Sequence, residues 1–155
     1  MLKKSDIKLG LRVEYKLFKY LKKNNSDVVW LSQTNQYSMF DYKLNDIYIE
    51  LKTRRYQKKR FDKNGHMIEL SKFKWLKDNN VKKAYIFYCY YDGLYRATFK
   101  LDSQEPIYRI ADGGRADREA SVELKKVAYI HSKHLKLVNK NFKTPKDKSL
   151  EECII

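Results

Sequence analysis

The sequence has few of the residues that build disulfide, zinc or phosphate-loop sites. It contains two cysteines, Cys89 and Cys153, which are too few for a disulfide framework. Its three histidines are scattered and offer no zinc site together with the cysteines. Its five glycines form no glycine-rich loop of the kind that binds nucleotide phosphates. These absences favour a protein of a reducing compartment whose chemistry uses other side chains.

Long apolar runs are also absent. No stretch approaches the ~20 residues that a membrane-spanning helix requires. Residues Met1 to Asp6 lack the apolar stretch of a signal peptide, so we expect a cytoplasmic protein. The abundance of Lys, Asn, Ile and Tyr is typical of proteins from AT-rich genomes, among them those of phages and other viruses. For a viral protein, the compartment would be the cytoplasm of the host cell.

What the chain has in excess is positive charge. Lys and Arg total 34 against 19 Asp and Glu, which gives a net charge of +15 over 155 residues. Self-repulsion of this size is usually tolerated because the partner is a polyanion, most often a nucleic acid. An anionic membrane surface is the other candidate; of the two we expect DNA and no membrane. Because 43% of the residues are apolar and 14% are aromatic, the chain can still form a packed core.

The length fits one domain followed by a tail. We expect the domain to span residues 1–138, and a flexible basic tail to span residues 139–155, where the chain becomes polar and rich in lysine. Apolar periodicity, with capping and turn residues between the periodic segments, predicts an α/β fold in the order α-β-β-β-α-β with a β-rich extension. The expected helices cover residues 5–23 and 70–78, and the expected strands cover residues 28–31, 37–44, 47–53, 84–91, 94–100, 106–110 and 124–130.

An Asn-Asp turn at residues 45–46 joins two of the expected strands. With this turn, the residues pair across the hairpin so that Asp41 lies opposite Glu50. The apolar face then carries Phe40, Tyr42, Leu44, Ile47, Ile49 and Leu51, and the polar face carries Asp41, Lys43, Tyr48, Glu50 and Lys52. Because a shift of one residue would mix the two faces, the register is well specified.

Asp41 and Glu50 would therefore be neighbours, with Cβ atoms roughly 4.5–5.5 Å apart. Two like charges at this distance destabilise a hairpin unless a positive charge lies between them. A divalent cation is one candidate, since Mg²⁺ prefers one or two carboxylates together with water and phosphate oxygens. The lysines of the same face, Lys43 and Lys52, are the other candidate, in which case the pair belongs to a solvated polar face without a metal.

Glu14 is a third acidic residue in an unusual position. It lies within the apolar stripe of the first expected helix, three residues before Leu17 and seven before Leu21. A carboxylate on a buried stripe is costly unless it is paired or bound to a metal. We therefore include Glu14 in the candidate site; the alternative is a position at the edge of the stripe, paired with a lysine.

These elements, taken in order, resemble the motifs of the PD-(D/E)xK nuclease superfamily. Glu14 falls on a first helix, Asp41 on a second strand and Glu50-Leu51-Lys52 on a third, and the resemblance covers residues 5–91. Phe40 precedes Asp41 where the motif's name has proline. The resemblance implies a restriction-endonuclease-like αβββαβ core with a mixed central sheet, and hydrolysis of DNA phosphodiester bonds with Mg²⁺ or Mn²⁺.

The resemblance also implies a role for each matching residue. Asp41 and Glu50 would bind the metal, with the Leu51 backbone carbonyl as a further ligand. Lys52 would orient the attacking water or help to deprotonate it, and would stabilise the negative charge of a phosphorane-like transition state. Glu14 would complete the site through a second metal or a water. General physics agrees, since a bound metal lowers the pKa of its water and a preorganised cation stabilises developing negative charge.

A basic run directly follows the expected catalytic strand. From Lys52 to Arg60, six of nine residues are Lys or Arg and none is acidic. We expect this run to contact DNA phosphates at the mouth of the site, against the alternative of a solvated loop. The contacts would come from Arg54, Arg55, Lys58, Lys59 and Arg60. A looser basic stretch between residues 133 and 148 and the loop around residues 115–118 are weaker candidates for the same role.

The expected function is a metal-dependent DNA endonuclease. The nearest alternative among enzymes is a structure-selective resolvase of four-way junctions, which would share this core and size and act as a homodimer. A non-catalytic nucleic-acid-binding protein of the same fold is a second alternative, but it would not need Asp41, Glu50 and Lys52 together. A basic RNA-binding protein of unrelated fold is the third; in such a protein the hairpin carboxylates would be incidental.

Overall fold

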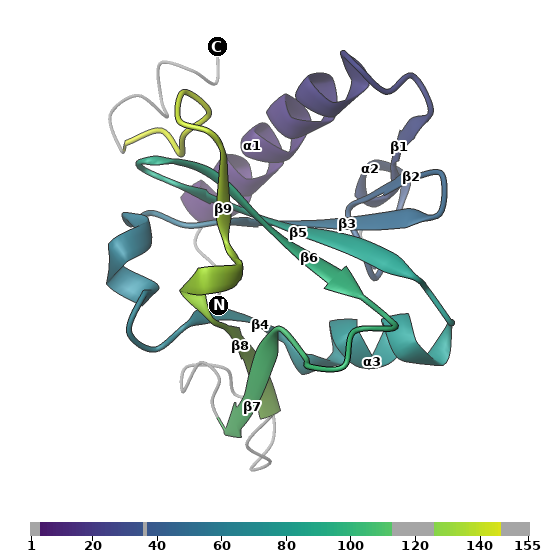
Figure 1. Cartoon of the computed structure of the whole chain (residues 1–155). Helices are drawn as coiled ribbons and strands as arrows, with labels where there is room; N and C mark the ends of the chain where they lie inside the picture. The colour runs from purple at the N-terminus through teal and green to yellow at the C-terminus, as the bar shows by residue number, and fades with distance from the viewer. Residues whose placement is uncertain (1–3, 36, 113–125, 147–155) are drawn as a thin grey trace.

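Helices and strands alternate along the first half of the chain, and strands predominate in the second half. The computed structural model describes residues 4–35, 37–112 and 126–146 (Figure 1). The helices are α1 (Lys4–Lys22), α2 (Leu31–Thr34) and α3 (Leu70–Asp78), with the 3₁₀ helices η1 (Lys58–Phe61) and η2 (Ser132–His134). The strands are β1 (Val28–Trp30), β2 (Tyr42–Leu44), β3 (Ile47–Thr53), β4 (His66–Glu69), β5 (Lys83–Tyr90), β6 (Gly93–Lys100), β7 (Tyr108–Asp112), β8 (Lys126–Ile130) and β9 (Lys136–Asn139).

The strands form two sheets. The larger sheet has six strands in the order β1-β2-β3-β5-β6-β9 and is mixed, because β3 and β5 are parallel while its other neighbouring strands are antiparallel. The smaller sheet has the order β4-β8-β7 and is antiparallel. The parallel pair needs a crossover, and η1, β4 and α3 supply it between β3 and β5.

The α/β class and most of the expected elements are confirmed. Strand β3 and helix α3 have the expected bounds, and the expected pairing of β2 with β3 across the Asn-Asp turn is observed. The strand expected over residues 37–44 is wrong in its first half, because the chain forms α2 after β1 and becomes extended only at Tyr42. Strands β4 and β9 were not expected. No helix among the described residues is both long enough and apolar enough to cross a membrane.

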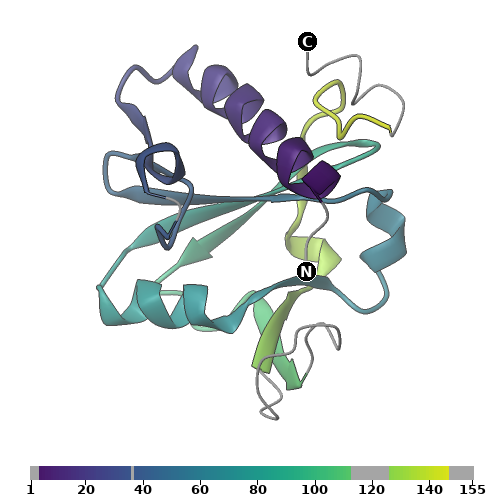
Figure 2. The same ribbon diagram turned by 180° about the vertical axis from the view of Figure 1, so that it is seen from behind.

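Helix α1 covers one face of the larger sheet, as the opposite views in Figures 1 and 2 both show. Its buried side chains recur every four residues, which is the spacing that aligns side chains along one face of a helix. They are Leu9, Val13, Leu17 and Leu21, and they pack with Tyr42 and Ile49 of the hairpin. Leu11 is 55% exposed, because the stripe runs through Leu9 and Val13 on either side of it.

Helix α3 and the smaller sheet cover the other face, so the expected polar face of the hairpin is enclosed. Tyr48 packs against Trp75 of α3 with ring centroids 5.0 Å apart. The Phe40 ring packs against the rings of Tyr48 and Trp75, with centroid distances of 5.7 and 5.5 Å. Phe40 was expected on the α1 side of the sheet with Tyr42, and this expectation is wrong. The reason is that Phe40 precedes β2, so the alternation of the strand does not extend to it. Glu50 is consequently only 4% exposed.

The packed part of the chain extends past residue 138, where the flexible tail was expected to begin. Thr144 is 2% exposed, its N–H donates to the Tyr90 carbonyl at 3.0 Å, and its Oγ1 donates to the Cys89 carbonyl at 2.8 Å. Cys89 is a buried free thiol, and burial raises its pKa to about 11. Residues 147–155, which include Cys153, lie outside the described residues.

A buried histidine joins the two sheets. His66 of β4 is 1% exposed; its Nδ1 lies 2.5 Å from the Tyr90 hydroxyl and its Nε2 lies 2.8 Å from Ser132 Oγ. Ser132 Oγ donates to Asp62 Oδ1 at 2.5 Å, so it accepts from Nε2–H, and Nδ1 accepts from Tyr90. This is not a hydrolytic triad, because Asp62 lies on the Nε2 side of the ring with the serine.

We predict that His66 makes the protein sensitive to mild acid. Burial, followed by the charge of Lys58, lowers the pKa of His66 to about 4, although Asp62 acts in the opposite direction. Because the folded-state pKa lies below the usual 6.5, the unfolded chain takes up a proton at His66 before the folded protein does. The stability that neutral His66 contributes is therefore complete above pH 6.5 and is lost as the pH falls towards 4. Between pH 7 and pH 5 the wild type should therefore lose about 2 kcal/mol of unfolding free energy more than His66→Gln, measured by urea denaturation. His131→Gln, at an exposed histidine, should keep the pH dependence of the wild type, and equal slopes for wild type and His66→Gln would contradict the assignment.

Candidate active site

Asp41 is fixed to the hairpin by backbone and side chain together. It lies immediately before β2, and its N–H donates to the Ile49 carbonyl at 3.1 Å. Its carboxylate Oδ2 accepts the Leu51 N–H at 2.9 Å. Its carbonyl accepts the N–H groups of Leu31 and Ser32, at 2.8 and 3.2 Å, where α2 begins. The carboxylate is therefore held at the edge of β3, next to Glu50, although Asp41 itself lies outside the strand.

Glu50, Lys52 and Glu69 form a chain of alternating charges. Lys52 Nζ lies 3.1 Å from Glu50 Oε2, and it donates to both carboxylate oxygens of Glu69, at 2.8 and 2.7 Å. Lys72 of α3 approaches Glu50 from the other side, at 3.4 Å, and also donates to the Met39 carbonyl. Two cations thus balance the buried Glu50 carboxylate, and β4 and α3 supply the groups that complete the cluster.

Glu14 reaches the same region from α1. It is half-buried at the edge of the helix's apolar stripe, and its Oε1 accepts hydrogen bonds from Trp30 Nε1, at 2.8 Å, and from Ser32 Oγ. Its backbone carbonyl accepts from the Tyr42 hydroxyl. The alternative of a lysine partner is therefore not observed among the described residues, where a neutral indole and a hydroxyl hold Glu14.

Three carboxylates consequently influence one another. Burial, then the charges of Glu50 and Glu14, raise the pKa of Asp41 to about 8, while the Leu51 N–H and Lys72 act in the opposite direction. In the absence of a metal, Asp41 therefore carries a proton at neutral pH. This is the electrostatic cost that the sequence predicted for adjoining acids, and a bound cation would remove it.

Lys52 stays protonated. Burial favours its neutral form, but the carboxylates of Glu50 and Glu69 outweigh burial and raise its pKa. Burial favours the neutral form of Glu69 too and by itself would raise the pKa of Glu69, but Lys52 lowers that pKa to about 2. An ammonium ion has no lone pair to accept a proton, so of the two roles expected for Lys52 this geometry favours orienting water and stabilising charge over deprotonation.

A metal would find two carboxylates here rather than three. Among residues 4–35, 37–112 and 126–146, no group of three or more His, Cys, Asp or Glu side chains is arranged to hold a metal ion. Glu14 Oε1 accepts from Trp30 and Ser32. The candidate ligands are therefore the carboxylates of Asp41 and Glu50. The Leu51 carbonyl is a third candidate, because it points to the same side of β3 as the Leu51 N–H, which faces Asp41. Hard oxygen donors of this kind suit Mg²⁺ or Mn²⁺.

The basic run divides into paired and surface-directed residues. Arg55 forms an ion pair with Asp6 of α1 at 2.9 Å, and Lys58 forms one with Asp62 at 2.8 Å. Arg54 and Arg60 line a pocket beside the candidate site. Lys59 is exposed on η1. The structure thus brings part of the run to a surface that a phosphate could approach. Of the weaker basic candidates, the lysines between residues 133 and 146 are exposed, whereas residues 115–118 and Lys148 lie outside the described residues.

Sequence reasoning missed Glu69 and Lys72. Lys72 lies four residues before the buried Leu76, a spacing that places it over the buried face of α3, and this could have been read from the sequence. Glu69 had no comparable signal, because β4 is short and pairs with a strand more than fifty residues later in the chain.

Comparisons of the chain with known protein families, with curated proteins and with solved structures found no match. The candidate site therefore rests on the geometry described above.

We predict that Asp41→Asn stabilises the metal-free protein. Because folding raises the pKa of Asp41 from 3.8 to about 8, its ionisation costs stability, and this cost grows as the pH rises through that range. In EDTA, the melting temperature of Asp41→Asn should exceed that of the wild type by roughly 5 °C at pH 9, with a smaller difference at pH 5. Asp102→Asn, at an exposed acid, should change it little at either pH. A variant that melts below the wild type at pH 9 would show that Asp41 is not under repulsion.

Proposed function

We propose that the protein is a metal-dependent DNA endonuclease that hydrolyses phosphodiester bonds. The observation that carries this proposal is the cluster on β3, where two neighbouring carboxylates, Asp41 and Glu50, adjoin an ammonium ion, Lys52, that is held between Glu50 and Glu69. Metal-assisted phosphodiester hydrolysis can use both charges, since the carboxylates can hold a cation and the ammonium can stabilise a negative transition state.

We also propose that α1, β1, β2, β3, α3 and β5 form a restriction-endonuclease-like core. Their order along the chain supports this assignment, with α2, η1 and β4 as insertions. So does the arrangement in which an antiparallel hairpin, β2-β3, continues into a parallel pair, β3-β5, with α1 and α3 on opposite faces.

Asp41, Glu50 and the Leu51 carbonyl would hold Mg²⁺ or Mn²⁺. When bound, the ion would lower the pKa of a coordinated water and screen the charge of the phosphate. The protein's own residues do the rest. Glu69 fixes Lys52 against Glu50, and Lys52 donates to the attacking water or to a phosphate oxygen. We assign Glu14 the role of holding a water or a second cation, through the carboxylate that Trp30 and Ser32 orient.

The first test is metal dependence on a panel of DNA substrates. The full chain should cleave at least one of supercoiled, linear, single-stranded and four-way-junction DNA with Mg²⁺ or Mn²⁺, and excess EDTA should stop it. Cleavage confined to junctions by a dimeric protein would assign the resolvase alternative. DNA binding without cleavage under every condition would assign the non-catalytic alternative, and cleavage that persists in EDTA would exclude the metal mechanism.

We predict that Lys52→Met removes cleavage and leaves DNA binding nearly intact. The loss of one preorganised charge at the reacting phosphate should slow turnover by roughly 10²–10³-fold. Affinity should change by less than about twofold, since a single lysine supplies only a small part of the total phosphate contact. Lys43→Met is the matched control, because Lys43 lies on the same hairpin with its Nζ over the Tyr48 ring at 5.1 Å. Wild-type turnover in Lys52→Met would remove Lys52 from the site.

A further inference from the structure

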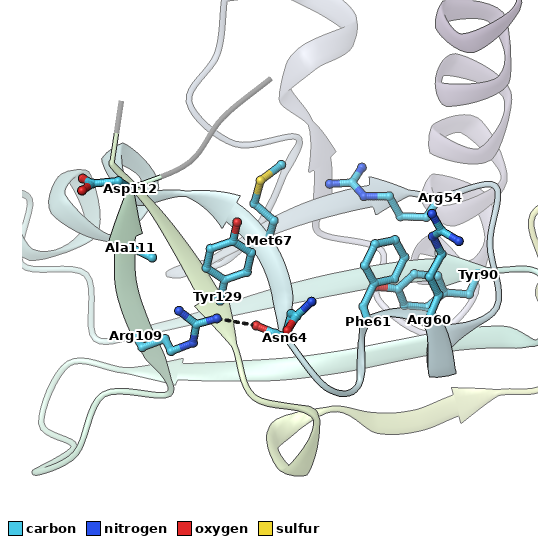
Figure 3. Close-up of a pocket in the computed structure, with 11 residues that line it drawn as sticks. Arg54, Arg60, Phe61, Asn64, Met67, Tyr90, Arg109, Ala111, Asp112 and Tyr129 are labelled. Carbon is cyan, nitrogen blue, oxygen red and sulfur yellow. Dashed lines mark hydrogen bonds between the residues drawn. The ribbon is translucent and has the colours of Figure 1, made fainter. Parts of the chain in front are cut away.

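A pocket of about 440 Å³ opens beside the candidate site (Figure 3). It lies between the segment that follows β3, the start of β4 and the strands β7 and β8. Arg54, Arg60, Arg109, Phe61, Tyr90 and Tyr129 are among the residues that line it. This volume lies in the range of pockets that hold one small ligand.

The pocket is continuous with the candidate site along two strands. Arg54 follows Lys52 by two residues, and Met67, which also lines the pocket, precedes Glu69 by two residues on β4. Met67 and Glu69 are two apart within β4, so they share a face and lie about 7 Å apart, and Arg54 directly follows the end of β3. A strand of DNA whose phosphate reached Lys52 would therefore bring a flanking nucleotide to this pocket.

Three guanidinium groups give the pocket its charge. Arg54 uses one N–H on the Thr53 carbonyl, at 3.2 Å, and Arg109 uses one on the Asn64 carbonyl, at 2.7 Å. None of the three forms an ion pair with a carboxylate of the described residues, and each guanidinium has five N–H donors, so most donors are available. Asp112 is the one acidic side chain among the described lining residues, and Figure 3 places it away from Arg54.

Aromatic rings give the pocket flat apolar walls. Phe61 and Tyr90 lie against each other with centroids 5.7 Å apart, and the Arg109 guanidinium lies 4.6 Å from the centroid of Tyr129. The backbone holds this wall close, because a Cβ on Gly65, whose φ is +98°, would come within 2.9 Å of Tyr129 Cβ. Arginines combined with aromatic faces are the groups that bind unstacked nucleotides, since the cations take the phosphate and a ring stacks on the base.

We infer that this pocket binds one unpaired nucleotide of a DNA strand, with the arginines on its phosphate and Tyr129 against its base. The inference deepens the proposed function and rests on it for the position of the strand. It makes single-stranded or branched DNA the preferred substrate, because a base inside a duplex is stacked on both sides and cannot enter the pocket without being extruded.

Binding in EDTA tests this inference separately from cleavage. The affinity of the full chain for a fluorescein-labelled oligo-dT of fifteen nucleotides, and for a duplex of equal length, is measured by anisotropy at one salt concentration. Arg109→Gln should weaken oligo-dT binding about tenfold. Arg96→Gln is the matched control, because Arg96 lies over the Tyr85 ring at 4.5 Å on β6, away from the pocket; it should weaken oligo-dT binding less than twofold. Duplex binding should fall equally and slightly in both variants.

Tyr129 supplies the second arm of the test. Tyr129→Leu should weaken oligo-dT binding at least fivefold, in line with the loss of one stacked base. Tyr129→Phe keeps the ring and should bind like the wild type. Thermal melting confirms that each variant is folded. Equal losses in Arg109→Gln and Arg96→Gln, or wild-type affinity in a folded Tyr129→Leu, would overturn the pocket, and tighter binding of an oligo-rU of equal length would overturn its assignment to DNA.

The two proposals can fail separately. If these variants behave as expected but no DNA is cleaved with Mg²⁺ or Mn²⁺, the pocket stands and the endonuclease fails. If the wild type cleaves DNA while the variants bind oligo-dT as it does, the endonuclease stands and the pocket fails.

Discussion

The position of the Lys52 ammonium between two carboxylates is the interaction on which the rest of the site depends. Glu50 is buried in the larger sheet, Glu69 ends the first strand of the smaller sheet, and Lys52 joins them at 3.1 and 2.7 Å. A buried carboxylate without partners is costly, and the lysine gives Glu50 a partner inside the protein. The same contact fixes β4 against β3. Electrostatics and architecture therefore depend on one side chain, and the removal of either acid would affect both.

Asp41 shows the opposite situation. Among the described residues it forms no ion pair, and burial together with the charges of Glu50 and Glu14 raises its pKa to about 8, although the charge of Lys72 acts in the opposite direction. A structural residue under this repulsion would be better replaced by asparagine, which could accept the same hydrogen bond from Leu51. The repulsion is understandable when the position serves a function that needs negative charge, since stability is often reduced at functional sites. This supports the reading of the cluster as a site.

How much of this could be predicted from the sequence depended on the range of the interactions. The hairpin register was predictable, because its two strands and turn are contiguous and a one-residue slip would mix apolar and polar side chains. That Glu14 faces the core side of α1 was predictable from its spacing to Leu17 and Leu21, but its partners Trp30 and Ser32 were not predictable. Phe40 was misplaced because alternation was extended beyond the strand. Strand β4, and Glu69 with it, could not be found locally, since its pairing partner β8 lies far along the chain.

That pairing also determines when the cluster of Glu50, Lys52 and Glu69 can assemble during synthesis. The smaller sheet has β8 at its centre, between β4 and β7, so β4 has no partner until residues 126–130 have left the ribosome. Pairings between segments so distant in sequence form late. Thr144 then closes the end of β5 from near the end of the described chain. Glu69 therefore gains its strand partner only after residues 126–130 have been made, so the cluster forms later in synthesis than the hairpin that carries Glu50 and Lys52.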